Sequence, residues 1–313
     1  MSRYDDCRST RRAVLGTGII LGLASARTSV SAQVIASPEA SPGAGPGYAR
    51  PEMLVDASRL RDRLDDPSVR VVGLMQAETF AMGAIPGSGQ IDWPDLEVTD
   101  TSNAPLADWQ ATVADHLTRL GLSREQMIVV YDEGTLFAAR LWWVLHYLGH
   151  EQVHVLDGGL PAWIEAGLDT ATEHVAPAVA EPYAGTIQPD ALAQVPDVEA
   201  AIGDARTVIV DARTPDEYTA GHIPGAVNLN YPLNAEPDTP RFWKPADDLK
   251  RLYAEAGITP DRRVIPYCST GVRSAVTYFT LRLIGYEDVS LFTGSWAEWV
   301  LDPERPVTTG AQP

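Results

Sequence analysis

The chain has 313 residues, 45% of them hydrophobic, which is enough for two ordinary domain cores. The formal net charge is −18, and Lys and Arg cluster only at the extreme N-terminus, so we expect no nucleic-acid partner. An acidic protein can still bind a small anion where a few basic groups and backbone amides converge.

Residues 1–32 have the composition of an export signal. A basic segment with Arg11 and Arg12 precedes the apolar residues 13–26, and Ser31-Ala32 provides a small-residue cleavage site. Residues 9–15 resemble a twin-arginine signal, so we expect an exported protein, periplasmic or extracellular. The alternative is an uncleaved membrane anchor. Because the apolar run is short for a bilayer, we expect no stable membrane insertion after signal removal.

The two cysteines of the chain are Cys7 and Cys268, and Cys7 lies in the predicted signal. The mature protein would then carry one thiol and no disulfide, in a compartment where paired cysteines are usual. Because a lone thiol there is open to oxidation, its retention indicates that Cys268 has a function.

Two domains are expected between flexible linkers. Residues 33–47 are rich in Ala, Ser, Pro and Gly, which is typical of a linker. Residues 48–172 then form a first domain and residues 187–307 a second, joined by the Ala- and Pro-rich residues 173–186.

Amphipathic helices and short apolar strands alternate in both domains. Helical spacing of apolar residues is found over residues 54–64, 106–120, 136–148, 247–256 and 273–284. Strands are expected over residues 69–73, 153–155, 207–211 and 264–267. This alternation predicts an α/β fold, with a parallel sheet flanked by helices on both faces in each domain. Ligands bind such sheets at the carboxyl ends of the strands.

The second domain repeats the first at an offset of 136 residues. This offset aligns Asp132 with Cys268 and continues without a gap for more than thirty residues. The matched pairs are Leu145 with Leu281, Gly149 with Gly285, Val153 with Val289, Gly158 with Gly294, and Trp163 with Trp299. Such agreement indicates a duplicated unit.

Cys268 lies where a predicted strand ends and a loop leads into a helix. The loop amides and the positive end of the helix dipole favour a thiolate, which is the nucleophilic form of cysteine. The same amides would bind an anionic group carried on the sulfur. Cys268 is therefore a candidate catalytic nucleophile. The alternative, an inert packed cysteine, does not explain why Gly271 and Arg273 follow so closely.

Ordered motifs in both halves resemble the tandem-domain rhodanese family of sulfurtransferases over about residues 48–307. The motifs are Asp211-Ala212-Arg213, Glu217-Tyr218, residues 221–228, the Cys268 loop, and residues 157–163 and 293–299. The resemblance implies two tandem rhodanese-like domains, of which the second is catalytic and the first is not. It also implies that the first domain supplies a wall of the active-site cleft.

The resemblance implies sulfur transfer through a persulfide on Cys268, without a metal or organic cofactor. The substrates would be a small anionic sulfur donor and a nucleophilic acceptor, either cyanide or a thiol. The loop residues assigned to substrate binding are Ser269, Thr270, Gly271, Val272, Arg273 and Ser274.

The resemblance also assigns Arg213 to binding anionic donor groups. The alternative for Arg213 is a surface salt bridge with Asp211 or Glu217. For Arg273, contact with substrate and bracing of the helix start both stay open.

Asp132 takes the place of the cysteine in the first half and cannot accept a sulfane sulfur. Because Glu133 follows it and two carboxylates repel an anion, we expect no anion cradle in this loop.

The histidines are expected to be structural. His222 lies in a Gly-His-Ile-Pro-Gly turn and would hold that turn by a hydrogen bond. His146, His150 and His154 recur every fourth residue, but Gly149 ends the helix before His154 enters a strand. They cannot share one helix face, so no metal site is expected.

Two other readings compete with an enzymatic sulfurtransferase. A cysteine phosphatase needs a longer loop than the four residues that separate Cys268 from Arg273. A non-turnover persulfide carrier, which delivers sulfur to a partner protein, stays open.

The sulfur donor is predicted to be thiosulfate, with 3-mercaptopyruvate as the alternative. Thr270-Gly271-Val272 resembles the loop of mercaptopyruvate-using relatives, but Ser269 and Arg273 depart from it. The charge of Arg273 and the predicted export favour the dianion thiosulfate.

Overall fold

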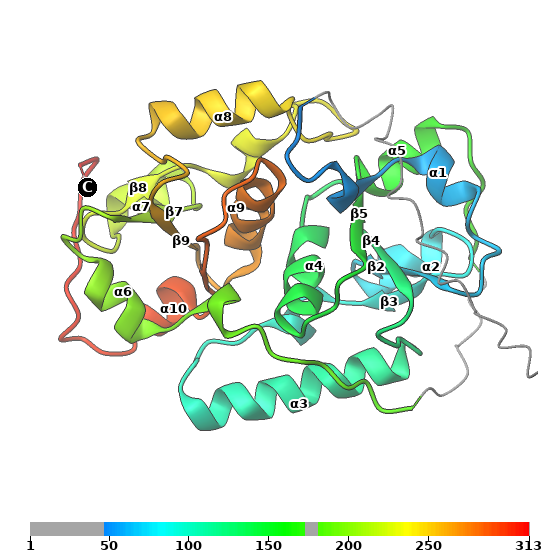
Figure 1. The fold of residues 1–313 in the computed structure, drawn as a ribbon, viewed down its shortest axis with the longest axis horizontal. Helices are drawn as coiled ribbons and strands as arrows, with labels where there is room; N and C mark the ends of the chain where they lie inside the picture. The colour runs from blue at the N-terminus through cyan, green and yellow to red at the C-terminus, as the bar shows by residue number, and fades with distance from the viewer. Residues whose placement is uncertain (1–46, 173–180, 313) are drawn as a thin grey trace, which may run out of the picture. The chain divides into compact units, whose positions relative to one another are not determined.

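Figure 1 shows a computed structural model of the chain, which describes residues 47–172 and 181–312. Two predicted segments lie wholly or mostly outside the described residues: the signal (1–32) and the linker 33–47, of which only residue 47 is described. Residues 173–180 of the predicted interdomain linker also lie outside them. Within the described ranges, no helix is both long and apolar enough to cross a membrane.

The first half contains a five-stranded parallel sheet with the order β1-β5-β4-β2-β3. Its strands are β1 (Leu54–Val55), β2 (Val69–Leu74), β3 (Gly89–Ile91), β4 (Met127–Tyr131) and β5 (Val153–Leu156). In the centre, Val72 of β2 pairs with Val130 of β4. These central strands are rich in valine and isoleucine because a parallel sheet is buried on both faces.

The second half repeats this arrangement strand for strand. Its strands are β6 (Leu192–Ala193), β7 (Thr207–Asp211), β8 (Val227–Asn228), β9 (Arg263–Tyr267) and β10 (Leu291–Phe292). They form the parallel groups β8-β7-β9 and β10-β6, which a parallel bridge between Val264 and Val289 connects. The resulting order β6-β10-β9-β7-β8 matches that of the first half, as the sequence repeat predicts.

Helices lie on both faces of each sheet (Figure 1). The first half has α1 (Ala57–Arg61), α2 (Ala77–Met82), α3 (Asn103–Arg119), α4 (Ala138–Tyr147) and α5 (Gly159–Glu165). The second has α6 (Val195–Ala201), α7 (Pro215–Ala220), α8 (Ala246–Glu255), α9 (Val272–Leu283) and α10 (Ser295–Trp299). Short 3-10 turns are η1 (Pro51–Met53), η2 (Trp93–Leu96), η3 (Pro189–Ala191) and η4 (Tyr231–Asn234).

The longer predicted helices are found within a few residues of their expected bounds. The prediction of one helix over residues 54–64 is wrong, because this segment begins with β1. Asp56 then caps α1, and its carboxylate accepts a hydrogen bond from the N–H of Arg59. An N-cap residue must leave the helical conformation, so helix α1 starts only after it.

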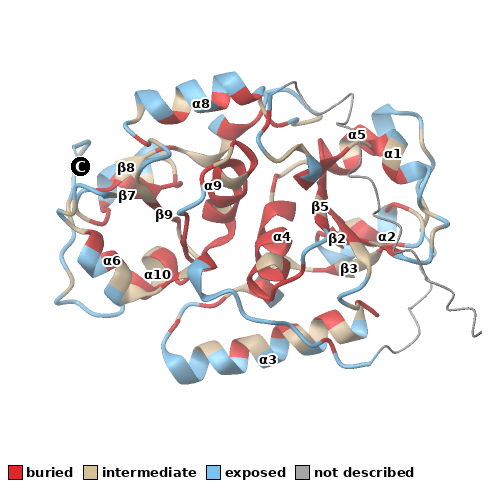
Figure 2. Cartoon of the chain, viewed as in Figure 1, coloured by how far each residue is buried: buried red, intermediate tan, exposed pale blue. Residues whose placement is uncertain are grey.

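The inner faces of the two sheets share one hydrophobic core. Residues of α3, α4, α8 and α9 belong to this core, whereas α1, α2 and α5, and likewise α6, α7 and α10, cover the outer faces. Helices α4 and α9 are buried along most of their length (Figure 2). Trp142 of α4 meets Phe279 of α9 edge to face, with ring centroids 5.0 Å apart. This geometry suits aromatic quadrupoles and joins the two halves.

Candidate active site

Cys268 follows β9 directly and is buried, with 1% of its surface exposed. Its N–H donates to the Ser295 hydroxyl at 3.1 Å, and its carbonyl accepts the N–H of Trp296 at 3.0 Å. The carbonyl of Ser269 accepts from Ala297 at 3.0 Å. The start of α10 therefore fixes the backbone that carries the sulfur.

The loop after Cys268 turns the backbone N–H of Gly271 toward the sulfur. The N–H of Gly271 donates to Sγ at 3.2 Å, and α9 begins at the next residue, Val272. The first-turn N–H groups of a helix, here those of Val272, Arg273 and Ser274, have no intrahelical acceptor. Together with the helix dipole, they place positive charge beside Sγ and favour an anionic sulfur.

Gly271 is required by the geometry of this loop. Its φ angle is 89°, in the left-handed region that favours glycine. A Cβ atom at this position would lie 2.5 Å from the carbonyl oxygen of Thr293. The close approach of Thr293 thus sets the shape of the amide cradle.

The remaining loop side chains differ in their surroundings. Ser269 and Thr270 are partly exposed, and the Ser269 hydroxyl contacts Arg273 at 2.5 Å and Glu217 at 3.3 Å. The hydroxyl of Ser274 is fully buried and has no hydrogen-bond partner within the described part of the chain. Their substrate contacts stay predictions.

Arg273 braces the loop from the first turn of α9. Its guanidinium binds the carboxylate of Glu217 with both amino groups, at 2.7 and 2.8 Å. Hydrogen bonds from Arg273 hold the pKa of Glu217 well below its usual range, and Glu217 raises the pKa of Arg273. Glu217 therefore compensates the positive charge that Arg273 was expected to add to the site.

Arg213 lies in a buried ion pair with Asp211. Its Nη2 donates to Asp211 at 2.6 Å and to the carbonyl of Gly221 at 2.7 Å. The guanidinium lies 4.6 Å from the ring centroid of Trp296. Burial lowers the pKa of Arg213, but Asp211 outweighs that effect and the net shift is upward. The salt bridge considered as an alternative is thus present, although it is buried and not at the surface. Contact between Arg213 and the sulfur donor stays a prediction.

Arg140 of α4 reaches from the first half to Thr293, which lies against Gly271 of the Cys268 loop, and sequence reasoning missed it. Its Nη1 donates to the hydroxyl of Thr293 at 2.7 Å, and its Nη2 donates to the carbonyl of Leu96. It is fully buried, and its guanidinium lies 4.9 Å from the ring centroid of Trp143. Burial lowers the pKa of Arg140 to about 10, although the interaction with Cys268 acts in the upward direction. An arginine inside the apolar run Ala138–Tyr147 was the available sequence signal.

The Asp132 loop contains an amide cradle, contrary to the sequence prediction. One carboxylate oxygen of Asp132 accepts the N–H groups of Gly134 and Thr135 at 2.7 and 3.0 Å. The other accepts the N–H of Ala138 at 2.7 Å. Burial raises the pKa of Asp132 despite these hydrogen bonds. The cradle exists, but it holds the chain's own carboxylate.

His222 holds its turn as predicted. It is buried, its Nδ1 lies 2.9 Å from the carbonyl oxygen of Tyr218, and the two rings stack at 3.7 Å. His146 belongs to α4 and His154 to β5, so the prediction that these two cannot share a helix face is confirmed. Among the described residues, no group of His, Cys, Asp or Glu is placed to hold a metal ion.

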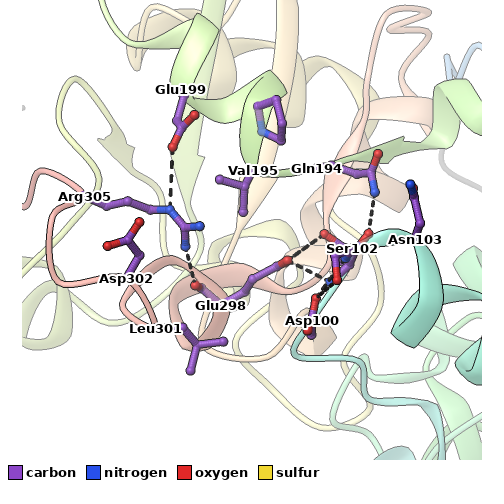
Figure 3. A pocket seen from close by; sticks show the side chains of 12 residues that line it. Asp100, Ser102, Asn103, Gln194, Val195, Glu199, Glu298, Leu301, Asp302 and Arg305 are labelled. Atoms are coloured by element: carbon purple, nitrogen blue, oxygen red, sulfur yellow. Dashed lines mark hydrogen bonds and ion pairs between the residues drawn. The ribbon is translucent and has the colours of Figure 1, made fainter.

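A cavity of about 600 Å³ lies beside α10, where the two halves meet (Figure 3). The carboxylate of Glu298 accepts the N–H and the hydroxyl of Thr101 at 2.7 and 2.8 Å, and burial raises its pKa. Arg305 donates to the carbonyl of Glu298 and pairs with Glu199. Cys268 does not line this cavity, whose acidic side chains do not suit an anionic donor.

Comparison with known proteins agrees with this geometry. The rhodanese-like domain family matches residues 56–166 and 194–302. A thiosulfate sulfurtransferase of Pseudomonas aeruginosa is 33% identical over 264 residues, which cover 82% of this chain and 96% of that protein. The sulfur carrier protein TtuD of Thermus thermophilus is 33% identical over 277 residues, which cover 81% of this chain and 95% of TtuD.

Comparison with a solved structure also indicates the rhodanese fold. The crystal structure of SseA from Escherichia coli, described as a 3-mercaptopyruvate sulfotransferase, superposes with a TM-score of 0.69 at 30% identity. The match covers 79% of this chain and 99% of SseA. With two matched domains, a repeated strand order and a cysteine in an amide cradle, the chain belongs to the rhodanese family of sulfurtransferases.

Proposed function

We propose that the chain is a thiosulfate sulfurtransferase that carries the transferred sulfur as a persulfide on Cys268. The contact that carries this proposal is the hydrogen bond from the Gly271 N–H to Sγ at 3.2 Å, at the start of α9. It marks the position where a negative charge on sulfur is stabilised.

The reaction proceeds in two displacements at the sulfane sulfur. The Cys268 thiolate attacks the outer sulfur of thiosulfate, a new S–S bond forms, and the old S–S bond breaks so that its electron pair leaves with sulfite. An acceptor such as cyanide then attacks the outer sulfur of the persulfide. Thiocyanate leaves and the thiolate is restored, so no redox partner is needed.

The burial of Cys268 favours small substrates. With 1% of the residue exposed, the sulfur is within reach of a small anion and a small nucleophile more readily than of a folded protein. This supports turnover with cyanide or a small thiol over delivery to a protein acceptor.

The charge argument for thiosulfate is reduced by the structure but not removed. Arg273 and Arg213 are both paired with carboxylates, so neither brings a free charge to a dianion. Arg140 brings a cation without a carboxylate partner among the described residues. The similarity to SseA makes 3-mercaptopyruvate the second candidate donor.

The donor assay separates these candidates. Thiocyanate release from cyanide is measured with thiosulfate or 3-mercaptopyruvate as the donor, over a range of concentrations. We expect the higher kcat/KM with thiosulfate. A higher value with 3-mercaptopyruvate would reassign the donor, and no turnover with either would favour a persulfide carrier, the role that the name of TtuD states for that protein.

We also propose that the protein is exported by its twin-arginine-like segment, with cleavage before Gln33. The support is the order of basic, apolar and small residues in residues 1–32. Fractionation of producing cells with an antibody against the protein tests this. Protein of full length in the cytoplasmic fraction would contradict it.

A further inference from the structure

We propose that Arg140, on the non-catalytic half, is a positioning residue whose positive charge balances the negative charge on Cys268. This inference rests on the proposed persulfide chemistry, in which the cysteine sulfur is anionic before the donor binds and the persulfide is anionic after it has reacted. The arginine acts on the sulfur across the Thr293 side chain and the loop amides.

The contacts lead from Arg140 to the sulfur in two steps. Nη1 of Arg140 donates to the Thr293 hydroxyl at 2.7 Å. Thr293 in turn lies against Gly271, where an added Cβ atom would stand 2.8 Å from that same hydroxyl. The N–H of Gly271 is the group that donates to Sγ at 3.2 Å. The guanidinium therefore lies directly behind the amide cradle.

The other two arginines near the sulfur already have carboxylate partners, although Arg273 also interacts with Cys268. Glu217 binds Arg273 through two hydrogen bonds, and Asp211 binds Arg213 at 2.6 Å. Arg140 has no carboxylate within ion-pair distance among the residues that the structure describes. A buried charge without a counter-charge is costly, so an arginine at this place needs a negative partner. A Cys268 thiolate or persulfide supplies that partner.

The fold itself does not require an arginine at this helix position. The repeat offset of 136 residues places Val276 of α9 opposite Arg140 of α4, and Val276 is fully buried in the shared core. The arginine thus occurs in the half whose helix reaches Thr293, the residue that lies against Gly271. The half that contributes the cysteine has an apolar residue there.

Several charged or titratable groups surround the sulfur and Arg140 and set the background of any pH profile. They are Asp211 of β7 with Arg213 just after it, Glu97 just after η2, Glu217 of α7, Tyr267 of β9 and Arg273 of α9. Since Asp211 and Arg213 form one ion pair and Glu217 and Arg273 another, these four contribute little net charge.

The test measures Cys268 alkylation by iodoacetamide as a function of pH, with the modified peptide identified by mass. In Arg140→Met we expect the midpoint of the pH profile to rise by about one pH unit, and the rate below it to fall roughly tenfold. Arg140→Lys keeps the charge and should stay within about threefold of the wild-type rate. Arg282→Met removes a partly buried arginine from the far end of α9 and serves as the matched control, with an unchanged midpoint.

A second variant avoids the buried site. Glu97→Gln removes a negative charge that acts on Arg140 from beyond ion-pair distance, so the midpoint should move in the opposite direction, to lower pH. If Arg140→Met loses thermal stability while its midpoint and that of Glu97→Gln stay at the wild-type value, Arg140 is only structural and the proposal is overturned. Alkylation needs no sulfur donor, so a wrong assignment of thiosulfate would leave this result unaffected.

Discussion

The loops after β4 and β9 occupy aligned positions in the repeat, but they differ in backbone conformation and in the group they hold. The first has left-handed residues at Gly134 and Leu136, and the second has one at Gly271. In the first loop the Asp132 carboxylate accepts three backbone N–H groups. In the second the Cys268 sulfur accepts the N–H of Gly271, which aligns with Thr135 in the repeat. A cradle filled by its own carboxylate cannot receive a substrate anion. The difference teaches that the reactive half needs both a cysteine in place of the aspartate and a loop whose amide turns toward the sulfur.

The largest effect is expected at the nucleophile. Cys268→Ser should lower sulfur transfer by at least about a thousandfold, because an alkoxide is not formed at neutral pH and no persulfide results. Thiocyanate release is the measurement. Full activity in this variant would mean that the two loops do not differ in the way described here.

Gly271→Ala tests the shape of the second cradle. The added Cβ atom would meet the Thr293 carbonyl at 2.5 Å, and the residue already has a left-handed φ of 89°. We expect a roughly tenfold or larger loss of kcat/KM and a stability loss of about 1–3 kcal/mol. Gly257→Ala, at φ 73° with open space around it, is the matched control for backbone strain alone. Equal loss of activity in both variants would argue against a role of the Thr293 contact.

Glu217→Gln should release Arg273 from its two-point contact and keep a side chain of similar size at position 217. We expect kcat/KM to fall by about three- to tenfold, since the loop that positions the amides is less firmly held. Steady-state kinetics with both donors measures the effect. A gain in activity with thiosulfate would show instead that Glu217 merely masks a donor-binding charge.

Asp132→Ala should leave turnover within about twofold of the wild type, because the first loop takes no part in the reaction. Removal of the carboxylate leaves one buried and two partly buried N–H groups without their acceptor, so the free energy of unfolding should fall by about 1–3 kcal/mol. Kinetics and denaturant unfolding together check this prediction. A large loss of activity in a protein of normal stability would contradict it.

A prediction that concerns stability and not activity involves Asp157, which aligns with Thr293 in the repeat. Asp157 accepts the N–H of Trp243 from the other half, and burial raises its pKa to about 7. A carboxyl group with a raised pKa stabilises the folded state most below its ordinary pKa, and this contribution is lost as pH rises through 7. Wild-type stability relative to Asp157→Asn should therefore decrease between pH 4 and 8, by roughly 2–4 kcal/mol at most. A constant difference would contradict the assignment.

The sequence predicted the architecture because its signals are local or repeated. The 136-residue offset and the alternating apolar segments led to two parallel sheets with the same strand order. Cys268 could likewise be identified from its neighbours. The prediction for residues 54–64 was wrong because the apolar residues of a two-residue strand and of the short helix after it together have the spacing of a single helix.

The electrostatics of the site could not be predicted, because its partners are distant in the sequence. Arg273 and Glu217 are 56 residues apart, and Arg140 and Thr293 are 153 apart. The sequence shows which charged residues the motifs contain, but it does not show which of them form ion pairs in the folded chain. The cradle around Asp132 was missed for a related reason: it is made of backbone amides, which no side-chain pattern reveals.

The most direct test of the comparison is the intact mass of the protein after incubation with thiosulfate in the absence of an acceptor. The wild type and Asp132→Ala should each gain the mass of one sulfur atom, which peptide analysis assigns to Cys268 and cyanide removes as thiocyanate. Cys268→Ser should gain nothing. A stable sulfur adduct on Cys268→Ser, or a wild type whose Cys268 stays unmodified while turnover proceeds, would contradict transfer through the second cradle.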